Sequence, residues 1–437
     1  MSTEEKMNIE ERYKYLRLMK KRYVKASRKE KSQLLDEMEE VTGLHRKSLI
    51  RLMNDDLERQ PRSKERGETY GREVDVALGV IDESFDYICA ERLTPNLVWM
   101  ACHLDAHDEL IATPSLLEQL EAISISTVRR RQARIRKYLP IPRLPRKKPS
   151  GSKLTQDIPM LRLPWDISDP GYLETDLVHH CGPTASGEYM HTLQMIDVAT
   201  GWSERVAVLG RGSVVMKDAF RRILLRLPFP ILEIHPDNGS EFFNHHMLRF
   251  WREIVRDVTI SRSRPFHKND NPRVEQKNST LVRAYLGDDR LDSVLQVIAA
   301  NELYDKMWVY YNLFQPVMHL AEKEISAEEG QPTRVKRRYD QARTPFDRLC
   351  ETHAILPEHR QQLETLRQQT NPRRLRQAIY DDIERIFSLP GATPGQTENV
   401  YLTLMDQLVP KEGTIHLLDF AFNRTVVEDD DDQPDAV

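Results

Sequence analysis

The period of the hydrophobic pattern changes near residue 164, and no other feature limits the possible folds of this chain as strongly. Before this position, apolar residues recur at helical spacing, as Leu34 and Met38 do. After it, short apolar runs such as 172–178 have the length and composition of strands. A chain of 437 residues with such a change is expected to form roughly two to four domains.

The region 164–325 is expected to form an α/β domain. Its order is three strands, a helix, a strand, a helix, a strand and a helix. The expected strands are 172–178, 189–198, 202–208, 231–234 and 258–261, and the expected helices are 217–227, 243–256, 272–283 and 291–312. This order predicts a mixed sheet with flanking helices, of the ribonuclease H type.

The N-terminal region 1–70 has the pattern of a helix-turn-helix. A capping-box sequence begins the supporting helix at Ser27, and Gly43 then interrupts the helical pattern. The next helix carries Arg46 and Lys47 near its start, where recognition helices contact DNA. We therefore expect an all-α DNA-binding domain, although many helical hairpins with this pattern do not touch DNA.

A second helix-turn-helix-like domain is expected at 71–140. A helix opens at Thr113-Pro114, and Ser124 is a capping residue for the helix that follows, at 128–138. This last helix carries a cluster of basic residues, which includes Arg129, Arg130 and Arg131. The cluster favours DNA binding, and the alternative is that the helices only pack against the rest of the protein.

The charge is distributed unevenly, although the formal net charge is only -4. From Arg129 to Lys153 the chain carries many basic residues and no acidic one. The segment 141–163, which contains the end of this run, is expected to be a stiff, basic, Pro-rich linker that follows the phosphates of DNA. The alternative is a linker that is merely solvated. The opposite extreme is an acidic tail at 428–437, which is typical of an interaction tail.

Region 326–427 is expected to be a mostly helical C-terminal extension, with helices at 357–369 and 372–387. No apolar run approaches the roughly 20 residues that span a bilayer, and the N-terminus lacks the apolar stretch of a signal peptide. We therefore expect no membrane partner and a cytoplasmic protein, associated with the nucleoid when DNA is bound. The four cysteines are scattered, which argues against a zinc ribbon or a disulfide framework.

Three carboxylates are placed where they could carry chemistry. Asp176 lies inside an apolar strand, where an ionised carboxylate is costly unless it is paired or binds a metal. Asp237 follows the strand 231–234, and Glu275 lies in the first turn of a helix that begins near Pro272. Side chains from two adjacent strands and one helix can converge at one end of a sheet. Such oxygen ligands suit Mg²⁺ or Mn²⁺.

Other residues near these acids have competing interpretations. Glu174 shares a strand face with Asp176 because side chains alternate along a strand, so Glu174 is the competing ligand. Asp197 is expected to cap the turn of a hairpin and not to bind metal. Trp202 and Trp308 are expected in the core.

Four segments together identify a family resemblance. They are Glu-Thr-Asp at 174–176, Ile-Asp-Val-Ala-Thr-Gly-Trp at 196–202, Asp-Asn-Gly-Ser-Glu-Phe at 237–242, and the stretch from Arg264 to Asn278 that contains Val-Glu-Gln-Lys-Asn. With these motifs, the region from about 173 to 316 resembles the catalytic core of DDE-type insertion-sequence transposases, which is similar to that of retroviral integrases. The distance of 38 positions between Asp237 and Glu275 is close to the usual spacing of this family.

The resemblance implies a transposase, a Mg²⁺-dependent polynucleotidyl transferase that cleaves DNA strands at the ends of a mobile element and joins them to target DNA. It implies that Asp176, Asp237 and Glu275 hold two Mg²⁺ or Mn²⁺ ions per active site. The partners would be double-stranded DNA and further copies of the same chain. His267, Lys268 and Lys277 would contact the DNA near the scissile phosphate, and the alternative is a generic basic surface.

Two other functions use the same residues. A ribonuclease H-like nuclease would have the same carboxylates, and a DNA-binding regulator could retain an inactive integrase core. Tandem DNA-binding modules favour the recognition of specific sites, and so favour transposition. The presence of all three expected acids argues against an inactive core.

Overall fold

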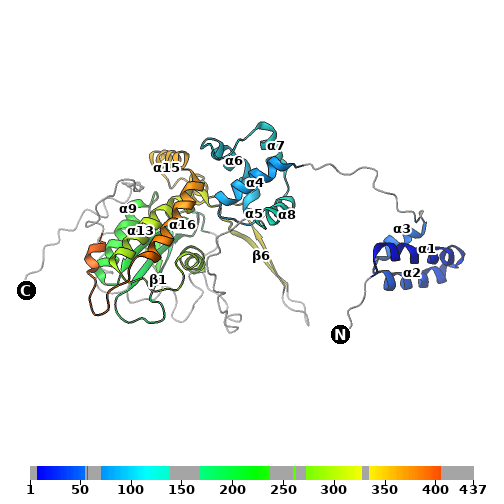
Figure 1. The fold of residues 1–437 in the computed structure, drawn as a ribbon, viewed down its shortest axis with the longest axis horizontal. Coiled ribbons are helices and arrows are strands. Elements are labelled where there is room, and N and C mark those ends of the chain that lie inside the picture. Colours follow the sequence, from blue (N-terminus) through cyan, green and yellow to red (C-terminus); the bar gives the residue numbers. More distant parts are fainter. Residues whose placement is uncertain are drawn as a thin grey trace, which may run out of the picture. The chain divides into compact units, whose positions relative to one another are not determined.

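A computed structural model gives the structure of the protein. It describes residues 7–54, 57, 70–137, 167–236, 259–261, 272–326 and 334–404. The chain divides into two compact units, residues 1–69 and 70–437 (Figure 1).

The N-terminal unit is helical, as expected. Its helices are α1 (Ile9–Lys25), α2 (Arg28–Thr42) and α3 (Arg46–Asn54). The backbone N–H of Ser27 donates to Glu30 Oε2 at 2.7 Å, which confirms the capping box at the start of α2. Gly43 ends α2 in the left-handed conformation with a φ of 65°. The three helices enclose a small core that includes Met38 and Leu49, both fully buried.

The second unit begins with a group of short helices. They are α4 (Arg72–Ser84), α5 (Ala90–Leu93), η1 (Thr94–Asn96), α6 (Leu97–Asp105), α7 (Pro114–Ala122) and α8 (Ile125–Arg136). Thr113 accepts a hydrogen bond from the Leu116 N–H at 3.2 Å and caps α7, while Ser124 accepts from the Thr127 N–H at 3.3 Å and caps α8. The predicted caps and the helical pair α7–α8 are therefore confirmed.

The five-stranded sheet of the second unit has the order β3-β2-β1-β4-β5. The strands are β1 (Tyr172–His179), β2 (Met190–Asp197), β3 (Ser203–Leu209), β4 (Glu233–Pro236) and β5 (Thr259–Ile260). β2 is antiparallel to β1 and β3, whereas β4 is parallel to β1 and β5. The sheet is therefore mixed, as the sequence predicts.

Helices that follow the strands complete this part. They are α9 (Ser213–Arg226), α11 (Pro272–Lys277), the π-helical η3 (Asn278–Arg283), α12 (Ala284–Leu286), α13 (Val294–Val309) and the π-helical η4 (Tyr310–Phe314). α9 and α13 both pack against the edge strand β3. The helix expected at 243–256 lies outside the described residues.

The turn between β2 and β3 depends on Asp197, as the sequence predicts. Its carboxylate accepts hydrogen bonds from the N–H and hydroxyl of Thr200 at 2.8 and 2.6 Å, and from the Gly171 N–H at 2.8 Å. Burial raises the pKa of Asp197 to about 6. Gly201 has a φ of 77°, a conformation that other residues rarely adopt. Asp197 is therefore a turn cap.

The C-terminal part adds a two-stranded ribbon and three helices. These are β6 (Leu320–Ser326), β7 (Arg334–Tyr339), α14 (Pro345–Cys350), α15 (Pro357–Gln369) and α16 (Pro372–Ser388), followed by the short η5 (Val400–Thr403). The helices predicted at 357–369 and 372–387 are confirmed. The ribbon was not predicted, and the expected boundary between 325 and 326 falls inside it.

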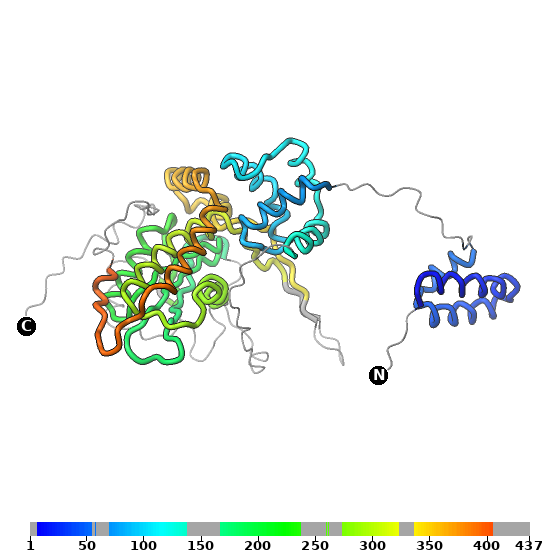
Figure 2. The backbone as a smooth tube through the Cα atoms, viewed as in Figure 1, coloured from blue at the N-terminus to red at the C-terminus, as the bar shows by residue number. Residues whose placement is uncertain are grey.

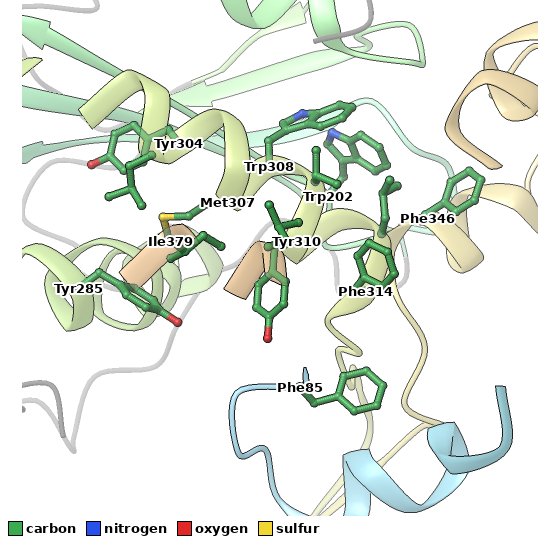
Figure 3. Packing of buried hydrophobic residues seen from close by; sticks show 14 of the residues in the cluster. Phe85, Trp202, Tyr285, Tyr304, Met307, Trp308, Tyr310, Phe314, Phe346 and Ile379 are labelled. Carbon is green, nitrogen blue, oxygen red and sulfur yellow. The ribbon is translucent and has the colours of Figure 1, made fainter. Parts of the chain in front are cut away.

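One hydrophobic core connects the helices α4–α8, the sheet and α16. Figure 3 follows it from Phe85 through Phe314 to Trp202 and Trp308, with Ile379 of α16 nearby. α13 and α16 lie side by side (Figure 2), and Lys306 and Asp382 join them by an ion pair of 2.6 Å. The helical segment 71–137 and the sheet thus share a core, and the boundary expected near 140 lies outside the described residues.

Among the residues whose structure is described, none of the helices has the length and apolar character that a membrane span requires.

Candidate active site

Strand β1 places two acidic side chains on the same face of the sheet. Glu174 is fully buried, while Asp176 is partly buried. In the parallel pair of β1 and β4, Thr175 lies opposite Pro236, the last residue of β4. Asp176 and Asp237 therefore each come one position after this pair in the sequence. Asp237, His267 and Lys268 lie outside the described residues.

Glu174, the competing ligand, has a different set of partners. Its Oε2 accepts hydrogen bonds from the backbone N–H groups of Arg273 and Val274 at 2.8 and 2.9 Å, and its Oε1 pairs with the Arg273 guanidinium at 2.9 Å. Burial raises the pKa of Glu174, and the Arg273 charge opposes that rise. The carboxylate therefore holds the first turn of α11, the helix that carries Glu275, and both of its oxygens are engaged.

The helix that begins at Pro272 lies against Asp176. Glu275 lies in its first turn, as predicted, and its side chain is exposed. Asn278 lies three residues later, on the same side of the helix, and its Nδ2 donates to Asp176 Oδ2. The Oδ1 atom of Asn278 is buried and has no hydrogen-bond partner among the described residues. The turn that bears Glu275 is thus next to Asp176.

The chemistry of these side chains fits a hard divalent cation. Carboxylate and amide oxygens are the ligands that Mg²⁺ and Mn²⁺ prefer, and the buried Asn278 Oδ1 is an oxygen without a donor beside a carboxylate. In the described part of the chain, no three His, Cys, Asp or Glu side chains come together as a metal site. Asp237 lies outside that part.

Lys277 is positioned more deeply than a simple surface cation. It is partly accessible, but its pKa is lowered to about 8, because burial disfavours the ammonium and the charges of Arg92 and Arg205 add repulsion. Arg205 itself is buried, and its guanidinium nitrogens have no hydrogen-bond acceptor among the described residues. Lys277 therefore belongs to a group of positive charges beside the site.

The basic residues predicted to bind DNA are partly paired within the protein. On α8, Arg129 forms an ion pair with Glu91, and Arg131 forms one with Asp75. Arg130 is exposed and donates to Thr127 of the same helix at 3.3 Å. Pairing with acids from other helices neutralises part of the charge that the sequence shows as an uninterrupted basic run.

The two basic residues of α3 that were predicted to bind DNA also differ in whether they pair within the protein. Arg46 pairs with Asp36 and donates to Ser32 Oγ at 2.7 Å, whereas Lys47 is exposed. Arg46 therefore fixes the start of α3 against α2.

Sequence reasoning did not single out Arg273 or Asn278. Asn278 could have been found, since a residue three positions after a candidate ligand on a helix lies on the same side. The contact of Arg273 with Glu174 joins positions 99 residues apart, and no local pattern reveals it.

A cluster of histidines lies at the end of β1, beyond Asp176. The Nε2 of His180 is hydrogen-bonded to Thr192 Oγ1 at 2.9 Å, and His180 is fully buried. Burial lowers the pKa of His180 to about 3, and the charge of Arg283 acts in the same direction. The His180 ring is therefore neutral in the folded protein near pH 7.

His180→Gln is expected to make the protein less sensitive to acid. In the unfolded chain the pKa of histidine is near 6.5, so below this pH the unfolded state binds a proton that the folded state refuses until about pH 3. Stability from this group is present above pH 6.5 and is lost as the pH falls. Between pH 6 and 4 the unfolding free energy of the wild type should fall more steeply than that of the variant, by roughly 1.4 kcal/mol per pH unit.

Urea unfolding at pH 7, 6, 5 and 4 measures this difference. His353→Gln, at an exposed position, is the matched control and should keep the wild-type pH dependence. Equal pH dependence of His180→Gln and the wild type would contradict the assignment.

Comparison with known proteins identifies a relative. No protein-family model matches the sequence. In solved structures, the catalytic core domain of BIV integrase is similar, with 18% identity, a TM-score of 0.25, and coverage of 33% of this chain and 85% of that domain. The strand order and register of the mixed sheet are observed directly in this structure.

A second protein is more similar to this chain in sequence. The uncharacterized protein y4rM of Sinorhizobium fredii (strain NBRC 101917 / NGR234) is 34% identical over 305 residues, which cover 69% of this chain and 86% of that protein. This chain therefore belongs to the same protein family as y4rM.

Proposed function

We propose that this protein is a DDE-type transposase, which cleaves DNA at the ends of a mobile element and joins the ends to target DNA. The observation that carries the proposal is the placement of Asp176 beside the helix turn that bears Glu275, with Asn278 in contact with Asp176. Asp237 directly follows β4, which pairs in parallel with β1. Two acids from adjacent strands and one from a helix are the ligand set of a two-metal phosphoryl-transfer site.

In this proposal the side chains form three groups with different tasks. Asp176, Asp237 and Glu275 would hold two Mg²⁺ or Mn²⁺ ions, which when bound would activate the attacking water or 3′-hydroxyl and stabilise the leaving oxygen. Glu174 and Arg273 fix the start of α11, and with it the turn that bears Glu275. Lys277 contributes positive charge towards the phosphate backbone, together with His267 and Lys268.

DNA recognition is assigned to the helical parts. Lys47 of α3 and Arg130 of α8 are exposed on the second helix of each helix-turn-helix unit, which is the element that enters the major groove in such units. Arg46, Arg129 and Arg131 also pair with acids in the protein, so their contribution to DNA affinity is expected to be smaller. Two ends must be joined in one complex, which implies a homo-oligomer on DNA.

Asp237→Asn should abolish strand cleavage and strand joining. The substrate is labelled duplex DNA taken from the region that flanks the reading frame, incubated with full-length protein and Mn²⁺, and products are resolved on a denaturing gel. The wild type should give discrete cleavage near an inverted repeat and, with added plasmid, joined products. The variant should lose both by about a thousand-fold, because a missing ligand removes several kcal/mol of transition-state stabilisation.

Glu358→Gln, on the exposed surface of α15, is the matched control and should retain full activity. Cleavage without joining would favour the nuclease alternative. Sequence-specific DNA binding by a wild type that neither cleaves nor joins with Mn²⁺ would favour a regulator with an inactive core. Unchanged activity of Asp237→Asn would overturn the ligand assignment.

A further inference from the structure

The loop between α4 and α5 has an unusual backbone. Asp86 and Tyr87 have φ values of 54° and 58°, in the left-handed region. For residues other than glycine this conformation costs roughly 1–2 kcal/mol per residue, and it persists only where the surroundings impose it. Contacts from other parts of the chain must therefore hold this loop.

Three side chains from distant segments donate to the Asp86 carboxylate. Its Oδ1 accepts from Arg376 Nε at 2.8 Å and from the Tyr380 hydroxyl at 2.9 Å, both on α16. Its Oδ2 accepts from the Tyr285 hydroxyl at 3.0 Å, and Tyr285 is also hydrogen-bonded to Tyr311. The side chain of Arg376 is only 5% exposed and that of Asp86 19%, so water competes little for these contacts.

The carbonyl groups of the same loop are held as well. The Tyr310 hydroxyl donates to the Ser84 oxygen at 2.7 Å, and Gln315 Nε2 donates to the Phe85 oxygen at 2.9 Å. Figure 3 shows the Tyr310 hydroxyl directed towards the segment that bears Phe85. The end of α4 and the loop that follows it are thus fixed against η4 and the residue after η4.

Tyr285 lies on the same continuous helical segment as Glu275. This segment runs without interruption through α11, η3 and α12. Glu275 and Tyr285 are ten positions apart, which corresponds to roughly 15 Å along a helix. Glu174 holds the first turn of the segment, and Asp86 holds its last turn.

The middle of this helical segment has an unusual geometry, whose winding depends on the contacts that hold the two ends. The six residues of η3 are π-helical, a geometry that is rare and frequently found at functional sites. Asn278, which touches Asp176, is the first of them. A change in the winding of these turns would rotate or shift the turn that bears Glu275.

We propose that Asp86 and Tyr285 are positioning residues that set the Glu275 carboxylate against Asp176. The inference rests on the proposed function. The hydrogen bond between them fixes the far end of the helical segment, and therefore its rotation and winding. A displacement of about 1 Å at a reacting centre lowers the rate by roughly a hundred-fold, so a remote hydrogen bond can have a large effect. The contact also joins the helical region of α4–α8 to the carboxylate site.

Tyr285→Phe and Tyr380→Phe form a matched pair for a test. Each removes one hydroxyl that donates to Asp86, but only Tyr285 lies on the segment of Glu275. Single-turnover cleavage by the full chain is measured as a function of Mn²⁺ concentration. Tyr285→Phe should lower the maximal rate by about ten-fold or more and raise the half-saturating Mn²⁺ concentration several-fold, whereas Tyr380→Phe should stay within about two-fold of the wild type. DNA affinity should be unchanged in both.

Hydrogen exchange supplies a readout that needs no activity. Amides of residues 278–286 should exchange faster in Tyr285→Phe than in the wild type or in Tyr380→Phe. Equal exchange and equal Mn²⁺ dependence in the two variants would overturn the proposal. A wild type that lacks cleavage refutes the proposed function, and the exchange data still decide whether Tyr285 holds the segment.

Discussion

Asp176→Asn is expected to reduce strand cleavage by about a thousand-fold. In the absence of metal, its free energy of unfolding should stay close to that of the wild type. The loss follows from the proposed role of Asp176 as a metal ligand, because the removal of a ligand costs several kcal/mol of transition-state stabilisation. Stability should not fall by more than about 1 kcal/mol, because Asp176 is only partly buried and an amide can still interact with Asn278.

Glu174→Gln distinguishes the roles of the two acids of β1. This variant is expected to lose mainly stability, whereas Asp176→Asn is expected to lose mainly activity. Glu174 accepts three hydrogen bonds from the start of α11 and is fully buried. A neutral amide cannot accept on both sides and leaves Arg273 without its charged partner. The variant should therefore be less stable by roughly 2 kcal/mol or more, and it should lose activity in part, through the position of Glu275.

Thermal unfolding with and without Mn²⁺ distinguishes these outcomes. Mn²⁺ should raise the melting temperature of the wild type and of Glu174→Gln, since a ligand that binds only the folded state stabilises it. It should not raise that of Asp176→Asn. If Glu174→Gln loses the metal response and Asp176→Asn keeps it, the roles of the two residues are exchanged.

The sequence was sufficient to predict features that depend on neighbouring residues. The cap at Ser27, the break at Gly43 and the turn at Asp197 are formed by residues a few positions apart, and the structure has all three. Most predicted strands and helices lie within two or three residues of the observed ones for the same reason, since hydrophobic period is a local signal.

The parts that sequence reasoning missed depend on distant partners. Glu174 and Asp176 share a strand face, and only the contacts of α11 separate a helix cap from a candidate ligand. The acids that face Arg129 and Arg131 come from α5 and α4, more than 30 positions earlier. The ribbon of β6 and β7 was missed because its strands are charged and pair mainly with each other, without an alternating apolar face.

The buried ion pair of Arg226 and Glu204 also joins residues that are distant in the sequence, so no local pattern predicts it. Breaking this pair is expected to have the largest effect on stability. Arg226 on α9 is 6% exposed, and Glu204 on β3 is 1% exposed. The Oε1 of Glu204 also accepts from the indole N–H groups of Trp202 and Trp308 at 2.9 and 2.6 Å. Both tryptophans are in the core, as predicted, and each satisfies its single donor there.

Arg226→Met should destabilise the protein by about 3–5 kcal/mol, because it leaves a buried carboxylate without its counter-charge. Burial already raises the pKa of Glu204, and Arg226 opposes that rise. A raised carboxyl pKa means that stability is present at low pH and is lost as the pH rises. The destabilisation by Arg226→Met should therefore shrink as the pH is lowered.

Urea unfolding followed by tryptophan fluorescence measures this effect, since two indoles contact Glu204 directly. Arg360→Met removes an arginine from an exposed pair with Glu364 on α15 and is the matched control, with an expected change of less than about 0.5 kcal/mol. The double variant Glu204→Gln with Arg226→Met should recover part of the lost stability, because position 204 then no longer holds a buried charge without its partner. A loss from Arg226→Met no larger than that from Arg360→Met would contradict the buried pair.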